Sequence, residues 1–234
     1  MSAIEQVADS VYVVAGTNVN WSLITGDSGV VLVDAGYPRD TGAVLDSLRR
    51  IGHEPADLVA ILLTHAHLDH IGAIPTLVER TGVPVYTGAD EAAHARREYL
   101  QQITPVDMAR QLGTPGGPRW VFQTLRALGG HVRMSVPTAT SYDENTLRQL
   151  PGGIVAVPTP GHTTGHTAYL MPDEGIVFSG DALVTGHPLL PDTGLQALPE
   201  VFNHDETQTH TTAESLIAHR PRLLIPGHGK PMAR

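Results

Sequence analysis

The sequence predicts an α/β fold in which two β-sheets pack face to face and helices cover their outer faces. Strand-like runs occur early in the chain, further strand-like runs follow residue 154, and helix-like segments lie between them. Early strands, late strands and intervening helices are typical of a sandwich of two sheets with helices outside. The length of 234 residues suits one domain, residues 1–234, with a sizeable core.

The first part of the chain alternates β-like runs with turn signals. The apolar runs Val11–Val14, Trp21–Ile24 and Val30–Val33 predict strands. Gly26–Gly29 predicts the turn between the last two. An amphipathic helix is predicted over Thr41–Arg50, because its apolar side chains recur on one face.

A strand, a helix and a second strand are predicted next. Leu58–Leu63 has the composition of a buried strand, Pro75–Arg80 is predicted as a helix, and Val83–Tyr86 as another strand. Strand-like runs resume later at Ile154–Val157, Ala168–Leu170, Ile176–Phe178 and Leu223–Ile225, with a helix around Thr211–His219.

The block at about residues 91–130 differs in character and predicts a helical insert. Helical pieces are expected at Glu91–Gln102, Val106–Leu112 and Trp120–Leu128, separated by the breaker Thr114–Pro118. Such an insert is either a lid or pocket wall, or a helical layer that covers the sheet. Its apolar side chains also offer a surface through which a homodimer could pair, namely Leu100, Ile103, Val121, Phe122 and Leu125.

Composition limits the function classes. The formal net charge of −9 argues against a broad basic face, so we expect no nucleic-acid partner. No run is long and apolar enough to cross a bilayer, so we expect no membrane partner. The N-terminal residues lack the basic segment of a secretory signal, which favours a cytoplasmic protein. Cysteine is absent, so any metal must be held by histidines and carboxylates.

Histidine and aspartate are concentrated directly after the strand predicted at Leu58–Leu63. His65 and His67 are two positions apart, so both rings project to one side of an extended segment, and Asp69 and His70 follow past a bend. Three imidazoles and a carboxylate this close are costly to arrange unless a cation gathers them. The segment therefore predicts a metal site.

Other loops follow apolar runs in the same way and carry metal-binding residue types. Strand ends that open onto glycine-bearing loops can present ligands from a rigid scaffold to one point. The candidates on these loops are Asp34, His162, His166, Asp181 and His228.

Together these motifs resemble those of the metallo-β-lactamase superfamily, over nearly the whole chain from Asp34 to His228. The resemblance implies an αββα sandwich of two mixed β-sheets, with metals held between the sheets. By position it implies one metal bound by His65, His67 and His162, a second bound by Asp69, His70 and His228, and a bridging carboxylate from Asp181. Asp34 matches an aspartate that supports the metal loop without binding metal.

The resemblance also implies an enzyme. We expect a hydrolase that uses two Zn²⁺ ions, with Fe or Mn as alternatives, and a metal-bridging hydroxide as nucleophile. Asp69 would act as a catalytic residue that orients the hydroxide. The expected partner is a small-molecule substrate: an ester, a thioester or a lactone.

Departures from subfamily patterns narrow the substrate class. The metal loops resemble those of glyoxalase-II-like enzymes, but the basic glutathione-binding segment expected beyond His228 is missing. Penicillin-destroying members generally lack an aspartate where Asp181 stands. The quorum-signal lactonases have a tyrosine at the position of Val184. Two alternatives remain: a mononuclear iron oxidoreductase of the persulfide-dioxygenase type, with ligands such as His65, His162 and Asp181, or a metal-binding module without turnover.

The other polar candidates receive weaker roles. His166 has ligand spacing, but the resemblance assigns only His162. His187 is a candidate for substrate contact, and His204 and Asp205 are expected to form a loop or helix cap. Asn20 and Trp21 are placed on a hairpin over the site, with simple packing as the alternative for Trp21. The remaining histidines are expected at the surface: His53, His94, His131, His210 and His219.

Overall fold

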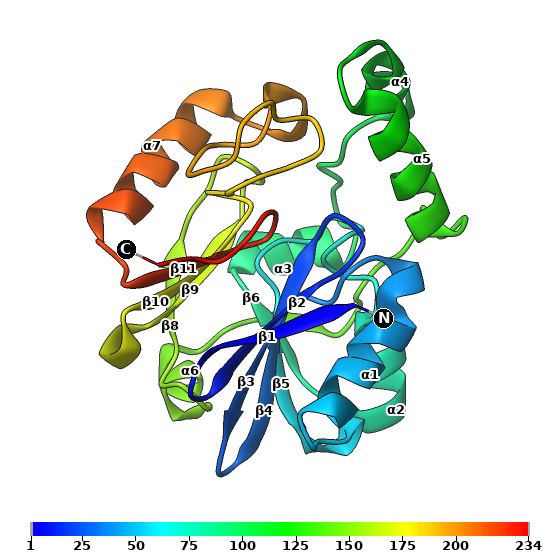
Figure 1. Ribbon diagram of the computed structural model, residues 1–234. Coiled ribbons are helices and arrows are strands. Elements are labelled where there is room, and N and C mark those ends of the chain that lie inside the picture. The colour runs from blue at the N-terminus through cyan, green and yellow to red at the C-terminus, as the bar shows by residue number, and fades with distance from the viewer. Residues whose placement is uncertain (1, 234) are drawn as a thin grey trace.

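Two β-sheets packed against each other form the centre of the molecule, as the sequence predicts (Figure 1). The structure is a computed structural model and describes residues 2–233. The seven-stranded sheet has the order β1(Ala3–Ala8), β2(Val11–Ala15), β3(Asn20–Gly26), β4(Gly29–Val33), β5(Leu58–Leu62), β6(Val85–Thr87), β7(Ala139–Ser141). The five-stranded sheet has the order β12(Met232–Ala233), β11(Leu223–Pro226), β10(Ile176–Gly180), β9(Thr167–Met171), β8(Val155–Pro158).

Both sheets are mixed. Strands β1 to β4 pair antiparallel, whereas β4 to β7 pair parallel. In the second sheet β10 and β11 are parallel and the other pairs are antiparallel. Parallel β4 and β5 therefore end at one edge of their sheet, as β10 and β11 do in theirs. The loops that carry the candidate ligands all begin at strand ends of this kind or after β8.

Alternation along the strands explains the layers. On β4, Val31 and Val33 point into the core between the two sheets, where they join Phe178 and Ile225 of the second sheet. Val30 and Leu32 point to the opposite face and pack under the helices. A strand buried on both faces needs this continuous apolar run rather than an alternation with polar residues.

Helices cover both outer faces. The first sheet is covered by α1(Thr41–Arg50) and α2(Ile74–Thr81), whose Leu48 and Leu77 are fully buried. The second sheet is covered by α7(Glu206–Ala218) through Ala213 and Leu216. The short helix α6(Glu144–Gln149), which the sequence analysis did not predict, buries Leu147 in the core between the sheets. No helix within residues 2–233 has the length and apolarity to cross a membrane.

The helical insert is shorter and more broken than predicted. Helix α3 covers only Ala89–Ala95, so the helix expected over Glu91–Gln102 is wrong beyond its first turns. The cause is Arg97, which adopts a left-handed backbone conformation with φ 65° and donates from its guanidinium to the carbonyls of Ala66 and Met134. The chain then runs without helix to α4(Pro105–Arg110) and α5(Gly117–Leu128), the green pair in Figure 1.

The apolar surface predicted on the insert is only partly exposed. Leu100, Phe122 and Leu125 are exposed, but Val121 is buried, so the expectation of Val121 on a pairing surface is wrong. Val121 lies on the inner face of α5, one turn of the helix from Thr124 and two turns from Leu128, which are also buried.

We predict that the ligand loop tolerates no side chain at Gly72. A Cβ there would overlap the backbone carbonyl of Tyr37, and backbone cannot move aside as a flexible side chain can. Gly72→Ala should therefore lower the free energy of unfolding by about 1–3 kcal/mol. Gly42→Ala, where a Cβ meets nothing within 4 Å, should raise it by up to about 1 kcal/mol. Urea denaturation measures both, and equal effects of the two variants would contradict the steric account.

Candidate metal centre

The structure brings all seven predicted ligand residues to one place between the ends of the two sheets. Their potential ligand atoms form three overlapping groups in which all atoms lie within 4.8 Å of one another: His65, His67 and His162; His65, His70 and Asp181; Asp69, His70 and His228. All are buried except Asp69, whose side chain is 15% exposed. Asp69 is therefore the candidate ligand most open to a substrate.

One half of the cluster consists of three imidazoles. His162 Nε2 lies 3.2 Å from His65 Nε2 and 3.1 Å from His67 Nδ1. The other half combines Asp69, His70 and His228: Asp69 Oδ2 lies 3.8 Å from His70 Nε2 and 3.5 Å from His228 Nε2.

The Asp181 carboxylate lies between the halves. Its Oδ2 is 3.5 Å from His162 Nε2 and 3.0 Å from His228 Nε2, and its Oδ1 is 3.5 Å from His70 Nε2. Ligands about 2.0–2.1 Å from a tetrahedral ion lie about 3.3 Å from one another. The separations in both halves are close to this value, so the donor set fits two small cations that share one carboxylate.

Hydrogen bonds on the outside of the cluster fix the ring orientation of the histidines. In each of the five, the ring nitrogen that points away from the cluster meets an oxygen that accepts its proton. The pairs are His65 Nδ1 with Thr64 Oγ1 (3.1 Å), His67 Nε2 with Gln101 O (2.8 Å), His70 Nδ1 with Asp34 Oδ2 (2.9 Å), His162 Nδ1 with Asn203 Oδ1 (3.0 Å), and His228 Nδ1 with the carbonyl of Asn18.

This arrangement fixes the tautomers. A neutral imidazole that donates from its outer nitrogen has a bare lone pair on its inner nitrogen. When all five rings are neutral, five such lone pairs therefore converge on the same small volume as two carboxylates. Histidines that bind metals donate their other N–H in this manner.

The electrostatics of the cluster also favour a cation. Burial and the neighbouring imidazoles hold the pKa of His65 and His67 well below the usual value. Burial opposes charge on His70 as well, but the carboxylates of Asp34 and Asp181 outweigh it and raise its pKa well above the usual value. His70 Nε2 and Asp181 Oδ1 are buried and have no hydrogen-bond partner, which is the state expected of atoms that a metal would satisfy.

Asp34 supports the ligand loop in the way the resemblance implies. Its Oδ1 accepts from the Thr64 backbone N–H at 2.9 Å, and its Oδ2 accepts from the Thr64 hydroxyl and from His70. Asp34 lies in the left-handed region, with φ 58°, directly after β4. One side chain thus holds both ends of the His65–His70 segment.

His166 lies beside the cluster but has no nitrogen free for a metal. Its Nδ1 donates to Thr159 Oγ1 at 2.7 Å, and its Nε2 accepts from the Asp181 backbone N–H at 3.1 Å. Burial lowers its pKa to about 3. His166 therefore positions Asp181, in keeping with the assignment of His162 alone as the ligand from this loop.

Sequence analysis missed a buried glutamate that ties two ligand loops together. Glu91 Oε1 accepts from the Ala66 N–H and from His94 Nδ1, both at 2.6 Å, and Glu91 Oε2 accepts from the Thr163 hydroxyl at 2.6 Å. His94 was expected at the surface, and this is wrong, because it is fully buried. His94 Nε2 accepts a hydrogen bond from the Gln101 backbone N–H. The backbone carbonyl of Gln101 in turn accepts a hydrogen bond from His67 Nε2.

The spacing of these two residues was the available signal. Glu91 and His94 are three apart in a helix, so they share one face with the small residues Ala92 and Ala95 beside them. Glu91 orients His94, His94 fixes the Gln101 backbone, and the Gln101 carbonyl orients the His67 ring.

The other candidates have the following positions. Asp205 caps α7 by accepting from the Gln208 N–H at 2.9 Å, as predicted. Trp21 is packed in the core, with its Nε1 donating to Ser47, whereas Asn20 donates to the carbonyls of Pro226 and Gly229 on either side of His228. His131, His210 and His219 are exposed and His53 is half-buried.

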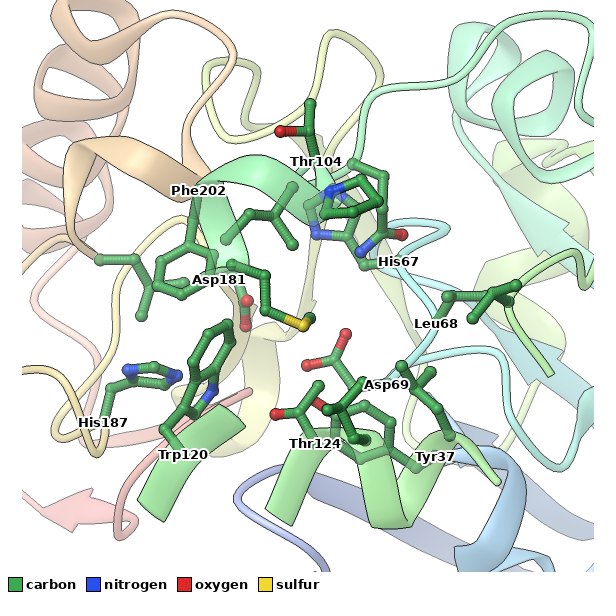
Figure 2. Close-up of a pocket in the computed structure, with 18 of the residues that line it drawn as sticks. Tyr37, His67, Leu68, Asp69, Thr104, Trp120, Thr124, Asp181, His187 and Phe202 are labelled. Carbon is green, nitrogen blue, oxygen red and sulfur yellow. The ribbon is translucent and has the colours of Figure 1, made fainter. Parts of the chain in front are cut away.

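A cavity of about 680 Å³ opens from the cluster. Figure 2 shows Trp120, His187 and Phe202 grouped on one side of it and Tyr37, Leu68 and Asp69 on the other. The His187 ring lies 5.2 Å from both the Phe202 and His228 rings and lines the cavity, and its contact with a substrate stays a prediction. Thr104 of the insert and His67 lie at a third side (Figure 2).

Comparison with known proteins agrees with this geometry. Residues 14–228 match the sequence model of the metallo-beta-lactamase superfamily. The probable metallo-hydrolase YflN of Bacillus subtilis is 30% identical over 216 residues, which cover 86% of this chain and 76% of the relative. The hydroxyacylglutathione hydrolase GloC of Haemophilus influenzae is 27% identical over 169 residues, which cover 71% of this chain and 68% of the relative.

Solved structures share the fold. A metallo-beta-lactamase family protein from Thermus thermophilus superimposes with a TM-score of 0.68 at 22% identity, over 97% of this chain and 76% of the other. A metallo-beta-lactamase of Cronobacter sakazakii gives a TM-score of 0.67 at 20% identity, over 97% and 78%. Both confirm the predicted two-sheet architecture.

We predict that Glu91 stabilises the site and the fold together. Glu91→Ala leaves three buried donors without an acceptor, so the free energy of unfolding should fall by about 3 kcal/mol. Glu79→Ala on the exposed face of α2 should change it by less than about 0.5 kcal/mol. Chemical denaturation compares the two, and a matching small effect at both positions would refute the role of Glu91.

Proposed function

Because the chain belongs to the metallo-beta-lactamase superfamily and is a metal-dependent hydrolase, we propose that it binds two divalent ions and hydrolyses a small ester, thioester or lactone. The observation that carries the proposal is the convergence of five inner histidine nitrogens on Asp69 and Asp181. In this proposal His65, His67 and His162 hold one ion, Asp69, His70 and His228 hold the other, and Asp181 contacts both. Zinc suits these donors, as do iron and manganese.

Two ions explain the donor set better than one. A single iron held by His65, His162 and Asp181 would leave His70 Nε2 buried without a partner. It would also not explain why His70 donates its Nδ1 proton to Asp34, which turns Nε2 toward the cluster. The same holds for His228, whose outer nitrogen is held by the carbonyl of Asn18. The dinuclear site uses both lone pairs.

Divalent ions at such a site supply Lewis acidity, which polarises a carbonyl and lowers the pKa of a water. The chain itself supplies a proton acceptor and a bounded cavity. Of the candidate ligands that line the cavity, Asp69 has the most exposed side chain, so its carboxylate is the group best placed to accept a hydrogen bond from the attacking water and hold its proton.

The relatives support an acyl substrate. Several carry the name hydroxyacylglutathione hydrolase, and that reaction is thioester hydrolysis. Thioesters, esters and lactones share an electrophilic carbonyl and a leaving group that departs from a tetrahedral state. One site can therefore serve all three classes, and the cavity walls select among them.

Metal analysis tests the ligand assignment. We expect two ions per chain by mass spectrometry of the metal content, and about one in His228→Ala, because this variant removes a donor from only one half. At a metal concentration about a thousandfold above Kd, each ion contributes about 4 kcal/mol, so chelation of both ions should lower Tm by about 16–32 °C. His219→Ala, on the exposed end of α7, should keep two ions. One ion in the unaltered chain, with no change in His228→Ala, would favour the mononuclear alternative.

Asp69→Asn tests the catalytic role. The amide is nearly the same size but is a poor proton acceptor, so kcat/KM for a chromogenic ester should fall about 10²–10⁴-fold. Asp192→Asn on an exposed loop is the matched control and should leave kcat/KM unchanged. Metal content measured on both variants separates a lost ligand from a lost proton acceptor. Full activity of a metal-loaded Asp69→Asn variant would overturn this mechanism.

A further inference from the structure

We propose that the cavity selects substrates with an uncharged apolar group, of medium-chain acyl or aryl size, and that the rim of helix α5 sets this preference. The inference rests on the proposed hydrolysis at the metal cluster and names the substrate class that the site takes. It is carried by the composition of the cavity walls, by their charge and by exposed apolar side chains at the cavity mouth.

The cavity is polar at its base and apolar along its walls. The candidate ligands His67, Asp69, His162, Asp181 and His228 lie at the base. From there the walls are formed mainly by aliphatic and aromatic side chains of the insert and of the segment before α7, among them Ile103, Met108, Trp120, Leu128, Leu198 and Phe202. A volume of about 680 Å³ is within the usual range for a small-molecule site. An acyl carbon at the base would extend its chain along these walls.

The walls offer little to an anion. Among the described residues that line the cavity, Arg133 is the one lysine or arginine, and it is exposed at the mouth. The chain as a whole has a net charge of −9, which disfavours approach of an anionic substrate. A glutathione thioester has two carboxylates and one ammonium group. The cavity wall is apolar and offers only Arg133 to pair with the two carboxylates. The charge distribution therefore favours a neutral substrate.

The mouth exposes large apolar side chains. Leu100 is 64% exposed, Leu125 55% and Val132 61%, and all three line the cavity. Leu100 and Leu125 come from separate segments of the insert, and Val132 follows α5. Exposed apolar side chains gathered around a pocket indicate a surface that a ligand covers. Because these side chains and the metal cluster line the same cavity, we assign this surface to the part of the substrate that is remote from its reacting carbonyl.

Helix α5 provides a matched pair of positions. Leu125 lines the cavity, whereas Phe122 is 66% exposed on the same helix and does not line it. Both are solvent-exposed, so a charge at either position is compatible with folding. A charge at position 125 would lie beside the apolar part of the substrate, but a charge at position 122 would face only water.

The test compares p-nitrophenyl esters from acetate to octanoate with the metal-loaded protein. Each methylene that reaches the walls should raise kcat/KM about fourfold, which corresponds to ~0.8 kcal/mol per buried CH₂. Leu125→Glu should lower the octanoate-to-acetate ratio of kcat/KM on the order of tenfold. Phe122→Glu should leave the ratio unchanged, and Val132→Glu gives a second rim variant if Leu125→Glu folds poorly.

A binding measurement separates the substrate class from the chemistry. Of the chain's two tryptophans, Trp21 is in the core and Trp120 lines the cavity, so tryptophan fluorescence reports on this wall. Titration with octanamide, a neutral amide, should give a saturable change that is lost in Trp120→Phe, and glutathione should give none.

The outcomes are distinguishable. Octanamide binding without turnover of any ester, thioester or lactone would overturn the proposed function and support the apolar site. Turnover that is fastest for acetate or for a hydroxyacylglutathione, or an octanoate-to-acetate ratio that Leu125→Glu and Val132→Glu leave unchanged, would overturn the apolar-substrate proposal while the hydrolase function stands.

Discussion

The convergence of five buried imidazole lone pairs on two carboxylates is the constraint on which the rest of this structure depends. Each lone pair points inward because an oxygen outside the cluster holds the proton of the same ring. Those oxygens come from a hydroxyl, a carboxylate, a side-chain amide and two backbone carbonyls, on segments as distant as Asn18 and Asn203. The geometry of the centre is therefore determined by a layer of residues that never contact the centre themselves.

The sandwich supplies the rigidity that this layer needs. Four of the strands that lead into ligand loops, β4, β5, β10 and β11, are almost entirely buried, so their ends have little freedom. Cross-links then join the two sheets at the cluster. Asn20 of β3 in the first sheet donates to the last residue of β11 in the second sheet and to the loop after it. Glu91 joins the loop after β5 to the loop after β8. The two halves of the cluster are thus fixed relative to each other by hydrogen bonds as well as by the apolar core.

The sequence was sufficient where local pattern determines structure. Apolar runs such as Leu58–Leu63 predicted strands correctly, and the histidine-rich segment after it predicted which side chains the fold brings together. The hydrogen-bond acceptor of His67 could not be predicted, because it is the backbone carbonyl of Gln101 and the pattern of side-chain types does not reveal backbone contacts. His94 was expected at the surface because the groups that hold its partner Glu91 in the interior, the Ala66 N–H and the Thr163 hydroxyl, lie far away along the chain. The left-handed turn at Arg97 depends on carbonyls far along the chain, so the helix predicted through it was too long.

The segment between α3 and α4 has two functions at once. Its Gln101 carbonyl orients the ring of His67, and its Leu100 and Ile103 form part of the cavity wall. The group that orients a candidate metal ligand and part of the cavity wall thus come from adjacent residues of a single stretch of backbone. Exchanging this stretch between relatives would disturb both together, whereas the exposed, apolar side chain of Leu125 on α5 lines the cavity and holds no ligand in place. Divergence of substrate range in this lineage should therefore proceed by point replacements on that helix, with the connecting stretch retained.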